Sequence, residues 1–150
     1  MIKELLSGMM KWWFNYTESF CEEIAANAWV EDKIRKQSKK AQVIVTDKYY
    51  YLATQKSMNS LLQMNLFKFA KFKNETRDCD DYSFASMAFM RWITPGFAFG
   101  IVHVDVVGGG KHALNFFLDD EGRLYYFEPQ TNEVILVAME NKYKPYLFII

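Results

Sequence analysis

Three residues of this sequence have the types and the order of a nucleophile, a base and an orienting acid: Cys79, His112 and Glu128. They lie in the stretches R-D-C-D-D-Y-S-F-A, G-G-G-K-H-A-L-N and L-Y-Y-F-E-P-Q-T. A cysteine attacks as the thiolate, which a neighbouring histidine stabilises by becoming cationic, and a carboxylate can hold that histidine in place. The arrangement therefore predicts the chemistry of a thiol hydrolase.

Cys79 follows Asp78, a good N-cap, so we expect it in the first turn of a helix. The helix N-terminus favours the thiolate, whereas the carboxylates of Asp78, Asp80 and Asp81 oppose it unless they point away or bind a cation. The alternative for Cys79 is a buried structural cysteine. We assign Cys21 to that alternative, because we expect it on a long N-terminal helix with no partner motif.

His112 and Glu128 are expected on consecutive strands whose alternate residues are apolar, so each side chain faces the core. A carboxylate in such a row is costly unless it is paired. If the D-D-E-G turn closes with an odd number of residues, both side chains lie on the same face of the hairpin. Gly122 favours this form because glycine adopts positive φ without strain. An even loop would separate the pair, and His112 alone would be an ordinary hydrogen-bonded core histidine.

Two further roles have several candidates. His103 is the other available base, but no acidic partner lies at a suitable position, and we rank it below His112. An oxyanion hole would combine the Cys79 backbone amide with an upstream donor, for which we name Asn74 and keep Gln63 and Gln55 as alternatives.

The hydrophobic pattern predicts an α+β fold. Residues 1–40 are expected to form a helical N-terminal segment of one or two amphipathic helices. A strand is expected at 42–45, with 49–52 as its continuation, followed by a helix from Ser57 and the helix that carries Cys79. Strand patterns follow from Phe97 onward. We therefore expect N-terminal helices and the Cys79 helix to pack on an antiparallel β-meander.

Composition limits the other possibilities. A chain of 150 residues, half of them hydrophobic, fits one globular domain spanning 1–150. Eighteen basic and eighteen acidic residues cancel, which argues against nucleic acid and membranes as partners. Two cysteines and no convincing signal peptide favour a cytoplasmic location. The sequence does not determine the oligomeric state.

At its three motifs the chain resembles the papain-like/transglutaminase-like superfamily, whose bacterial members carry G-D-C-x-D-Y-A, then H-A-W or H-A-V, then D-P-T. The corresponding stretches here are R-D-C-D-D-Y-S-F-A, K-H-A-L-N and F-E-P-Q-T. Glutamate in the last position departs from the usual aspartate or asparagine. It is more similar to the calcium-dependent papain-like protease domain of a mushroom agglutinin, whose triad also ends in glutamate. The match covers roughly residues 76–131.

The resemblance implies a cysteine peptidase or amidase that forms a thioacyl intermediate at Cys79, with His112 as base and Glu128 as orienting acid, acting on a peptide or protein. It also implies a calcium locus at Asp78, Asp80 and Asp81, for which helix capping is the alternative explanation. Two other functions stay open: a catalytically inactive binding module that uses the same cleft, and a peptidoglycan amidase. No other cofactor is required.

Overall fold

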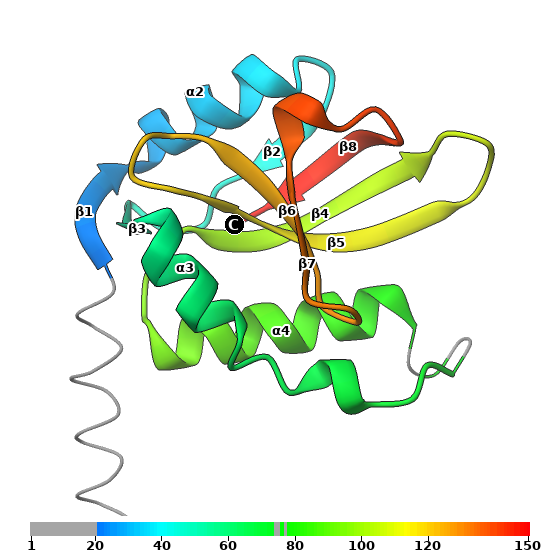
Figure 1. Ribbon diagram of the computed structural model, residues 1–150. Coiled ribbons are helices and arrows are strands. Elements are labelled where there is room, and N and C mark those ends of the chain that lie inside the picture. The colour runs from blue at the N-terminus through cyan, green and yellow to red at the C-terminus, as the bar shows by residue number, and fades with distance from the viewer. Residues whose placement is uncertain (1–20, 74–75, 77) are drawn as a thin grey trace, which may run out of the picture.

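The computed structural model describes residues 21–73, 76 and 78–150 of the chain (Figure 1). In chain order the elements are β1 (Cys21–Ala26), α2 (Asn27–Gln37), β2 (Gln42–Ile44), β3 (Tyr49–Ala53), α3 (Gln55–Leu62), η1 (Phe67–Phe69), α4 (Cys79–Ile93), β4 (Phe99–Val106), β5 (Lys111–Leu118), β6 (Leu124–Glu128), β7 (Glu133–Leu136), η2 (Val137–Met139) and β8 (Tyr143–Ile149). No helix in these ranges is both long and apolar enough to cross a bilayer.

A six-stranded sheet with the order β2-β8-β4-β5-β6-β7 forms the middle layer of the fold. Strands β4 to β7 make an antiparallel meander, and β8 then returns to the other side of β4. Strand β2 pairs with β8 in parallel, so the sheet is mixed. Figure 1 shows α2 on one side of this sheet and α3 and α4 on the other.

Each face of the sheet buries its own hydrophobic core. Toward α2, Val30 and Ile34 pack with Phe116, Tyr126 and other sheet residues of the same parity. Toward α3 and α4, Met58, Leu61 and Met90 pack with Phe99, Phe127 and other residues of the opposite parity. Because successive strand residues point to opposite faces, the central strands β5 and β6 read as almost continuous apolar runs.

The expected α+β class is confirmed, with two corrections. The sheet is not purely antiparallel, because β2 and β8 run in parallel. Residues 21–26 form the strand β1 rather than part of the expected N-terminal helix, since they pair in antiparallel register with β3. The aromatic run at Tyr49–Tyr51 is a strong strand former, and pairing with it overrides the helix preference of Glu and Ala. Within the expected helical segment 1–40, residues 27–37 are helical as α2, and residues 1–20 lie outside the described residues.

The helices after β3 follow the sequence closely at their starts. Helix α4 begins at Cys79 and carries the capping box of Asp78 and Asp81, in which Asp81 accepts a hydrogen bond from the Asp78 amide at 3.2 Å. Helix α3 begins at Gln55, two residues before the expected Ser57, and ends at Leu62. The buried side chain of Asn65 then donates to the carbonyl of Pro129 at 2.7 Å, which fixes the chain in a non-helical path.

The β5–β6 connection is held by the buried carboxylate of Asp119. It accepts hydrogen bonds from the Arg123 side chain at 2.6 Å and from the Tyr125 hydroxyl at 3.1 Å, and it also accepts the Glu121 and Arg123 amides. Gly122 adopts φ +74° in the same loop. The loop geometry therefore depends on one buried acid and one glycine.

Replacing Asp119 by alanine should lower the free energy of unfolding by about 3 kcal/mol, because several buried donors lose their acceptor together. Urea denaturation measures this change. Asp120→Ala removes the neighbouring, partly exposed acid and should stay within about 0.5 kcal/mol of the wild type. Equal losses in the two variants would contradict this account of the loop.

Candidate functional site

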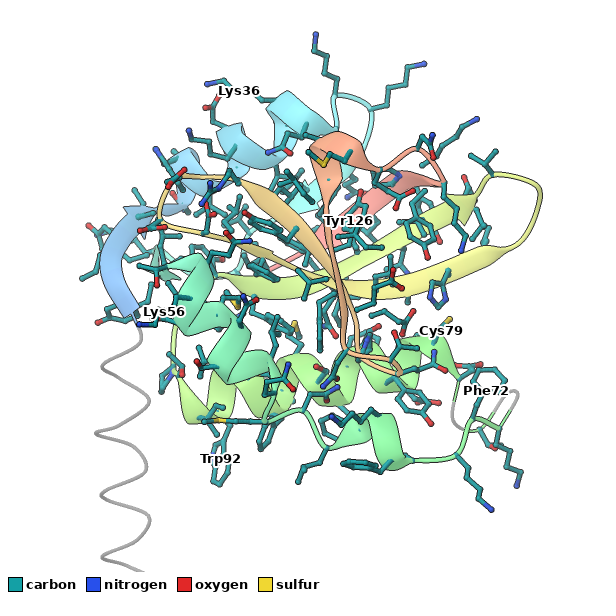
Figure 2. The ribbon with its side chains drawn as sticks, viewed as in Figure 1. Lys36, Lys56, Phe72, Cys79, Trp92 and Tyr126 are labelled. Atoms are coloured by element: carbon teal, nitrogen blue, oxygen red, sulfur yellow. The ribbon has the colours of Figure 1, made fainter. Side chains whose placement is uncertain are left out.

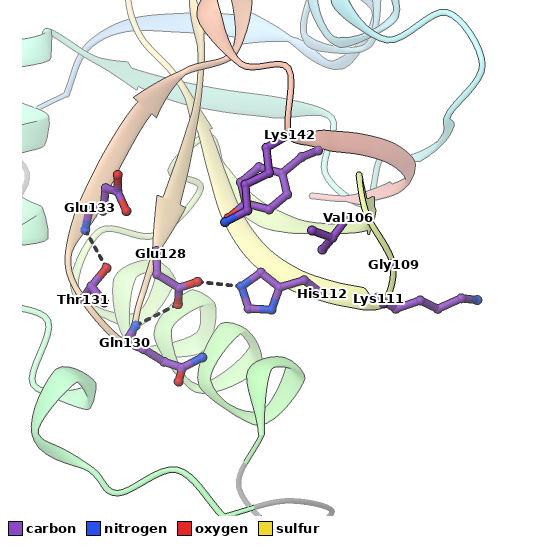
Figure 3. A pocket seen from close by; sticks show the side chains of 11 residues that line it. Val106, Gly109, Lys111, His112, Glu128, Gln130, Thr131, Glu133 and Lys142 are labelled. Carbon is purple, nitrogen blue, oxygen red and sulfur yellow. Dashed lines mark hydrogen bonds and ion pairs between the residues drawn. The ribbon is translucent and has the colours of Figure 1, made fainter.

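The structure brings His112 and Glu128 into direct contact. His112 Nε2 lies 2.6 Å from Glu128 Oε2, and the second carboxylate oxygen accepts the Gln130 amide at 3.0 Å (Figure 3). The five-residue loop 119–123 gives a register in which Phe116 faces Tyr126, so His112 and Glu128 are diagonal neighbours on one face. The side chains retain only 21% and 13% exposure.

Cys79 completes the group from the opposite layer. Its side chain hydrogen-bonds to the His112 ring from the first turn of α4. Since Nε2 is committed to Glu128, Nδ1 is the ring nitrogen that remains for the thiol. A second polar contact fixes this docking, because the buried amide of Asn115 on β5 donates to the Ser83 carbonyl of α4 at 2.9 Å. The three residues singled out from the sequence thus meet at one point.

These contacts favour the charged form of the histidine. The hydrogen bond with Cys79 and then the hydrogen bond with Glu128 raise the pKa of His112 to about 9, against the opposing effect of burial. His112 is therefore an imidazolium at neutral pH. The ring can therefore place a positive charge, held by Glu128, between the two sides of the site.

Two adjoining hollows flank His112, and the His112 and Lys111 side chains line both. We call the first the Glu128 hollow: it has a volume of about 430 Å³ and is lined by Gln130, Thr131, Glu133, Lys142 and Tyr143 besides Glu128. We call the second the Cys79 hollow: it has a volume of about 230 Å³ and is lined by Cys79, Asp80, His103 and Tyr146. Since the two hollows share these lining residues, we refer to the pair as the cleft centred on His112.

The acidic residues beside Cys79 lie together at the start of α4. One carboxylate oxygen from each of Asp78, Asp80 and Asp81 lies within 4.8 Å of the others. A hydrogen bond with the Asp78 side chain lowers the pKa of Asp80. Three carboxylates are suitable ligands for calcium, which prefers six to eight oxygens. The capping box already accounts for the positions of Asp78 and Asp81.

The other predicted residues have varied placements. Asn74, the expected oxyanion-hole donor, lies outside the described residues. His103 is close to the site after all, since it lines the Cys79 hollow and its ring lies 6.1 Å from that of Tyr146. Cys21 begins β1 instead of lying on a helix, which corrects its expected setting.

Sequence reasoning missed the residues of the cleft that come from β8 and the chain before it. Lys142, Tyr143 and Tyr146 reach the site because β8 pairs with β4. Nothing local in K-Y-K-P-Y-L-F indicates this neighbour. The glycine run 108–110, with positive φ at each residue, was a usable signal, because it marks a tight hairpin turn next to His112.

Comparisons with known proteins give similarity in structure alone. No protein-family model matches the sequence, and no curated protein matches it. One similar solved structure is described as "PSL1a-E64 complex", with a TM-score of 0.69 and 22% identity over 85% of this chain and 51% of that chain. Another is a Polyporus squamosus lectin bound to the human-type influenza-binding epitope Neu5Aca2-6Galb1-4GlcNAc, with a TM-score of 0.66 and 22% identity over 85% and 49%. The chain spans about half the length of these structures.

These neighbours correct the functional prediction. One of them is described as a lectin, which contradicts the predicted membership of the papain-like/transglutaminase-like superfamily and the predicted cysteine peptidase or amidase. A peptide substrate is likewise not supported. The alternative prediction of a binding module agrees better with them. The fold is shared at this level of identity, and the chemistry of the cleft has to be argued from its own residues.

The raised pKa of His112 predicts a pH-dependent stability. The imidazolium contributes its full stabilisation below the unfolded value of about 6.5, and this contribution is lost as pH rises through about 9, a difference on the order of 3 kcal/mol. Glu128→Gln removes the charged partner and should therefore destabilise the protein more at pH 6 than at pH 9.5. Denaturant unfolding at both pH values, with histidine NMR titration, measures the effect.

Glu133→Gln is the matched control, because Glu133 is an exposed acid directly across from Glu128 in the β6–β7 pair. It should lower the pKa of His112 far less than Glu128→Gln does. A loss of stability in Glu128→Gln that is the same at both pH values would contradict the ion pair.

Proposed function

We propose that this chain is a ligand-binding module and that its ligand occupies the cleft centred on His112. The observation that carries the proposal is the position of His112, which lines both hollows and is fixed by Glu128. Binding sites commonly combine a preformed concave surface with a few convergent polar groups. The cleft has both features.

The ligand class that fits this lining best is carbohydrate. Lys142, Glu133, Thr131 and Gln130 offer donors and acceptors in the Glu128 hollow, and the Tyr143 ring lies in the same wall. Sugar hydroxyls both donate and accept hydrogen bonds, and the C–H face of a sugar ring packs on aromatic side chains. The Cys79 hollow adds Tyr146, so each end of the cleft has one tyrosine.

The charge of the cleft also supports a polyhydroxylated ligand over a polyanion. Lysines and acids alternate around it, with Lys111 and Lys142 offset by Glu133 and Asp80, while His112 and Glu128 neutralise each other. Such a balanced site has no large field of one sign. The glycan bound to the similar Polyporus squamosus lectin supports the same choice of class.

We propose that Cys79, His112 and Glu128 contact this ligand directly. The imidazolium supplies positive charge, Glu128 holds its orientation, and the thiol of Cys79 lines the smaller hollow. A residence in the cytoplasm stays a prediction, as does the single-domain assignment.

Glycan binding is the first test. NMR titration of labelled protein with a panel of glycans, including Neu5Aca2-6Galb1-4GlcNAc, should shift signals around His112, Tyr143 and Tyr146. His112→Ala should weaken binding at least about tenfold, because it removes the positive charge of the cleft and leaves the Glu128 carboxylate unpaired. Blocking Cys79 with iodoacetamide should also weaken binding, since it fills the smaller hollow. Lys36→Gln, on α2, is the control and should change nothing.

Three results would contradict the proposal. The first is that no glycan in the panel shifts any signal of the cleft, and the second is that the shifts map to α2 instead. Release of a cleavage product from a chromogenic amide, lost in Cys79→Ala, would show that the cleft does chemistry and is no simple binding site.

We also propose that Asp78, Asp80 and Asp81 bind calcium, supported by the closeness of their carboxylates. Calcium at about 1 mM should then raise the melting temperature, and magnesium should raise it less, because magnesium requires stricter octahedral geometry. Asp80→Asn removes a ligand while keeping the capping box, so it should abolish the calcium effect without changing the melting temperature in chelator. If calcium raises the melting temperature of Asp80→Asn as much as that of the wild type, the three acids do not bind calcium and serve only to cap the helix.

A further inference from the structure

The segment 66–73 combines exposed apolar side chains with lysines. Leu66 is 65% exposed, Phe69 is 75% exposed and Phe72 is 56% exposed. Lysines alternate with them in L-F-K-F-A-K-F-K, and the segment contains no acid. Large apolar side chains gathered in eight residues are unusual on a surface in contact with water alone.

The segment is held firmly in this exposed position. Phe67 turns inward and packs edge-on against Phe89 of α4, with ring centroids 6.1 Å apart. The Tyr82 hydroxyl donates to the Ala70 carbonyl at 2.5 Å, and buried Asn65 anchors the start of the segment. These contacts hold the backbone of the segment in place, so the Phe69 and Phe72 side chains are exposed in the folded protein.

From these contacts we infer that residues 66–73 dock on an anionic lipid surface, with Leu66, Phe69 and Phe72 entering the boundary between headgroups and acyl chains and Lys68, Lys71 and Lys73 contacting lipid phosphates. Apolar side chains with interleaved lysines are the pattern of interfacial membrane binding. The long aliphatic stems of lysine allow the ammonium groups to stay at the headgroup level while the rings go deeper.

The zero net charge of the chain does not oppose this docking. Electrostatic attraction to a membrane acts within about 8–10 Å at physiological ionic strength, so the local charge of the contacting segment decides. Figure 2 shows Phe72 at the edge of the molecule near the Cys79 end of α4, and Lys36 on the other side of the sheet. Asp81 shares a hollow with Phe67 and Ala70, and its carboxylate is engaged in the capping contact.

Two other occupants fit less well. A second copy placed by a two-fold axis would bring the same lysines against each other, which like charges disfavour. Single-stranded nucleic acid needs a groove that follows its backbone and rings for base stacking. The aliphatic Leu66 offers no stacking face.

Co-sedimentation of the full chain with vesicles tests the inference. Binding should be strong to phosphatidylcholine vesicles that contain about 30 mol% phosphatidylserine, weak to phosphatidylcholine alone, and reduced by salt. Replacing Lys68, Lys71 and Lys73 by glutamine should lower the partition coefficient on the order of 100-fold, from about fivefold for each lysine. Phe69→Ser with Phe72→Ser should lower it at least about tenfold, and circular dichroism should show that both variants stay folded.

A matched control uses the other lysine cluster of the chain. Lys36, Lys39 and Lys40 are also exposed but have no exposed aromatic residues between them, so their replacement by glutamine should change the partition coefficient less than about twofold. An equal loss in this control, or equal binding to vesicles with and without phosphatidylserine, overturns the inference. Unchanged vesicle binding in the variant with Phe69→Ser and Phe72→Ser also overturns it. The inference is likewise wrong if residues 66–73 bind single-stranded RNA or a second copy of the chain and the protein does not bind vesicles.

Discussion

The register of β5 against β6 is the constraint on which the cleft depends. Successive strand residues point to opposite faces, so a shift of one residue would send Glu128 into the opposite core and leave His112 without its carboxylate. The five-residue loop sets this register, and Asp119 and Gly122 set the loop. A buried acid far from the cleft therefore determines whether the histidine is charged.

The third member of the group depends on a separate contact between layers. Asn115 bonds to Ser83, one turn into α4 from Cys79, and to the Gly100 carbonyl of β4. Gly100 has no space for a side chain, because an added Cβ would lie 2.3 Å from the Ile149 carbonyl oxygen and 2.6 Å from the Phe116 ring. This space belongs to the core under α2, where the Phe116 ring packs, whereas Asn115 on the opposite face holds α4 to the sheet.

The local parts of this arrangement were predictable from the sequence. The start of α4 follows from the capping residues Asp78 and Asp81, and the same-face placement of His112 and Glu128 follows from strand alternation and Gly122. The rest depends on pairings between distant residues. Strand β8 returns across the sheet to bring in Tyr146, and β1 forms only because β3 lies beside it. A single sequence carries little information about such partners, and short motifs shared with a family did not determine the function.

Helix α4 connects the cleft to the exposed segment 66–73. Its first residue, Cys79, contacts His112, and Tyr82 in the next turn holds Ala70 through the hydroxyl. The two features are thus fixed to the same end of one rigid helix, with the acidic residues of its first turn between them. A surface that takes up the Phe69 and Phe72 side chains would consequently hold the cleft in a defined orientation. Tyr82 and Cys79 belong to the same helix, so no flexible loop lies between the residue that holds the segment and the residue that lines the cleft.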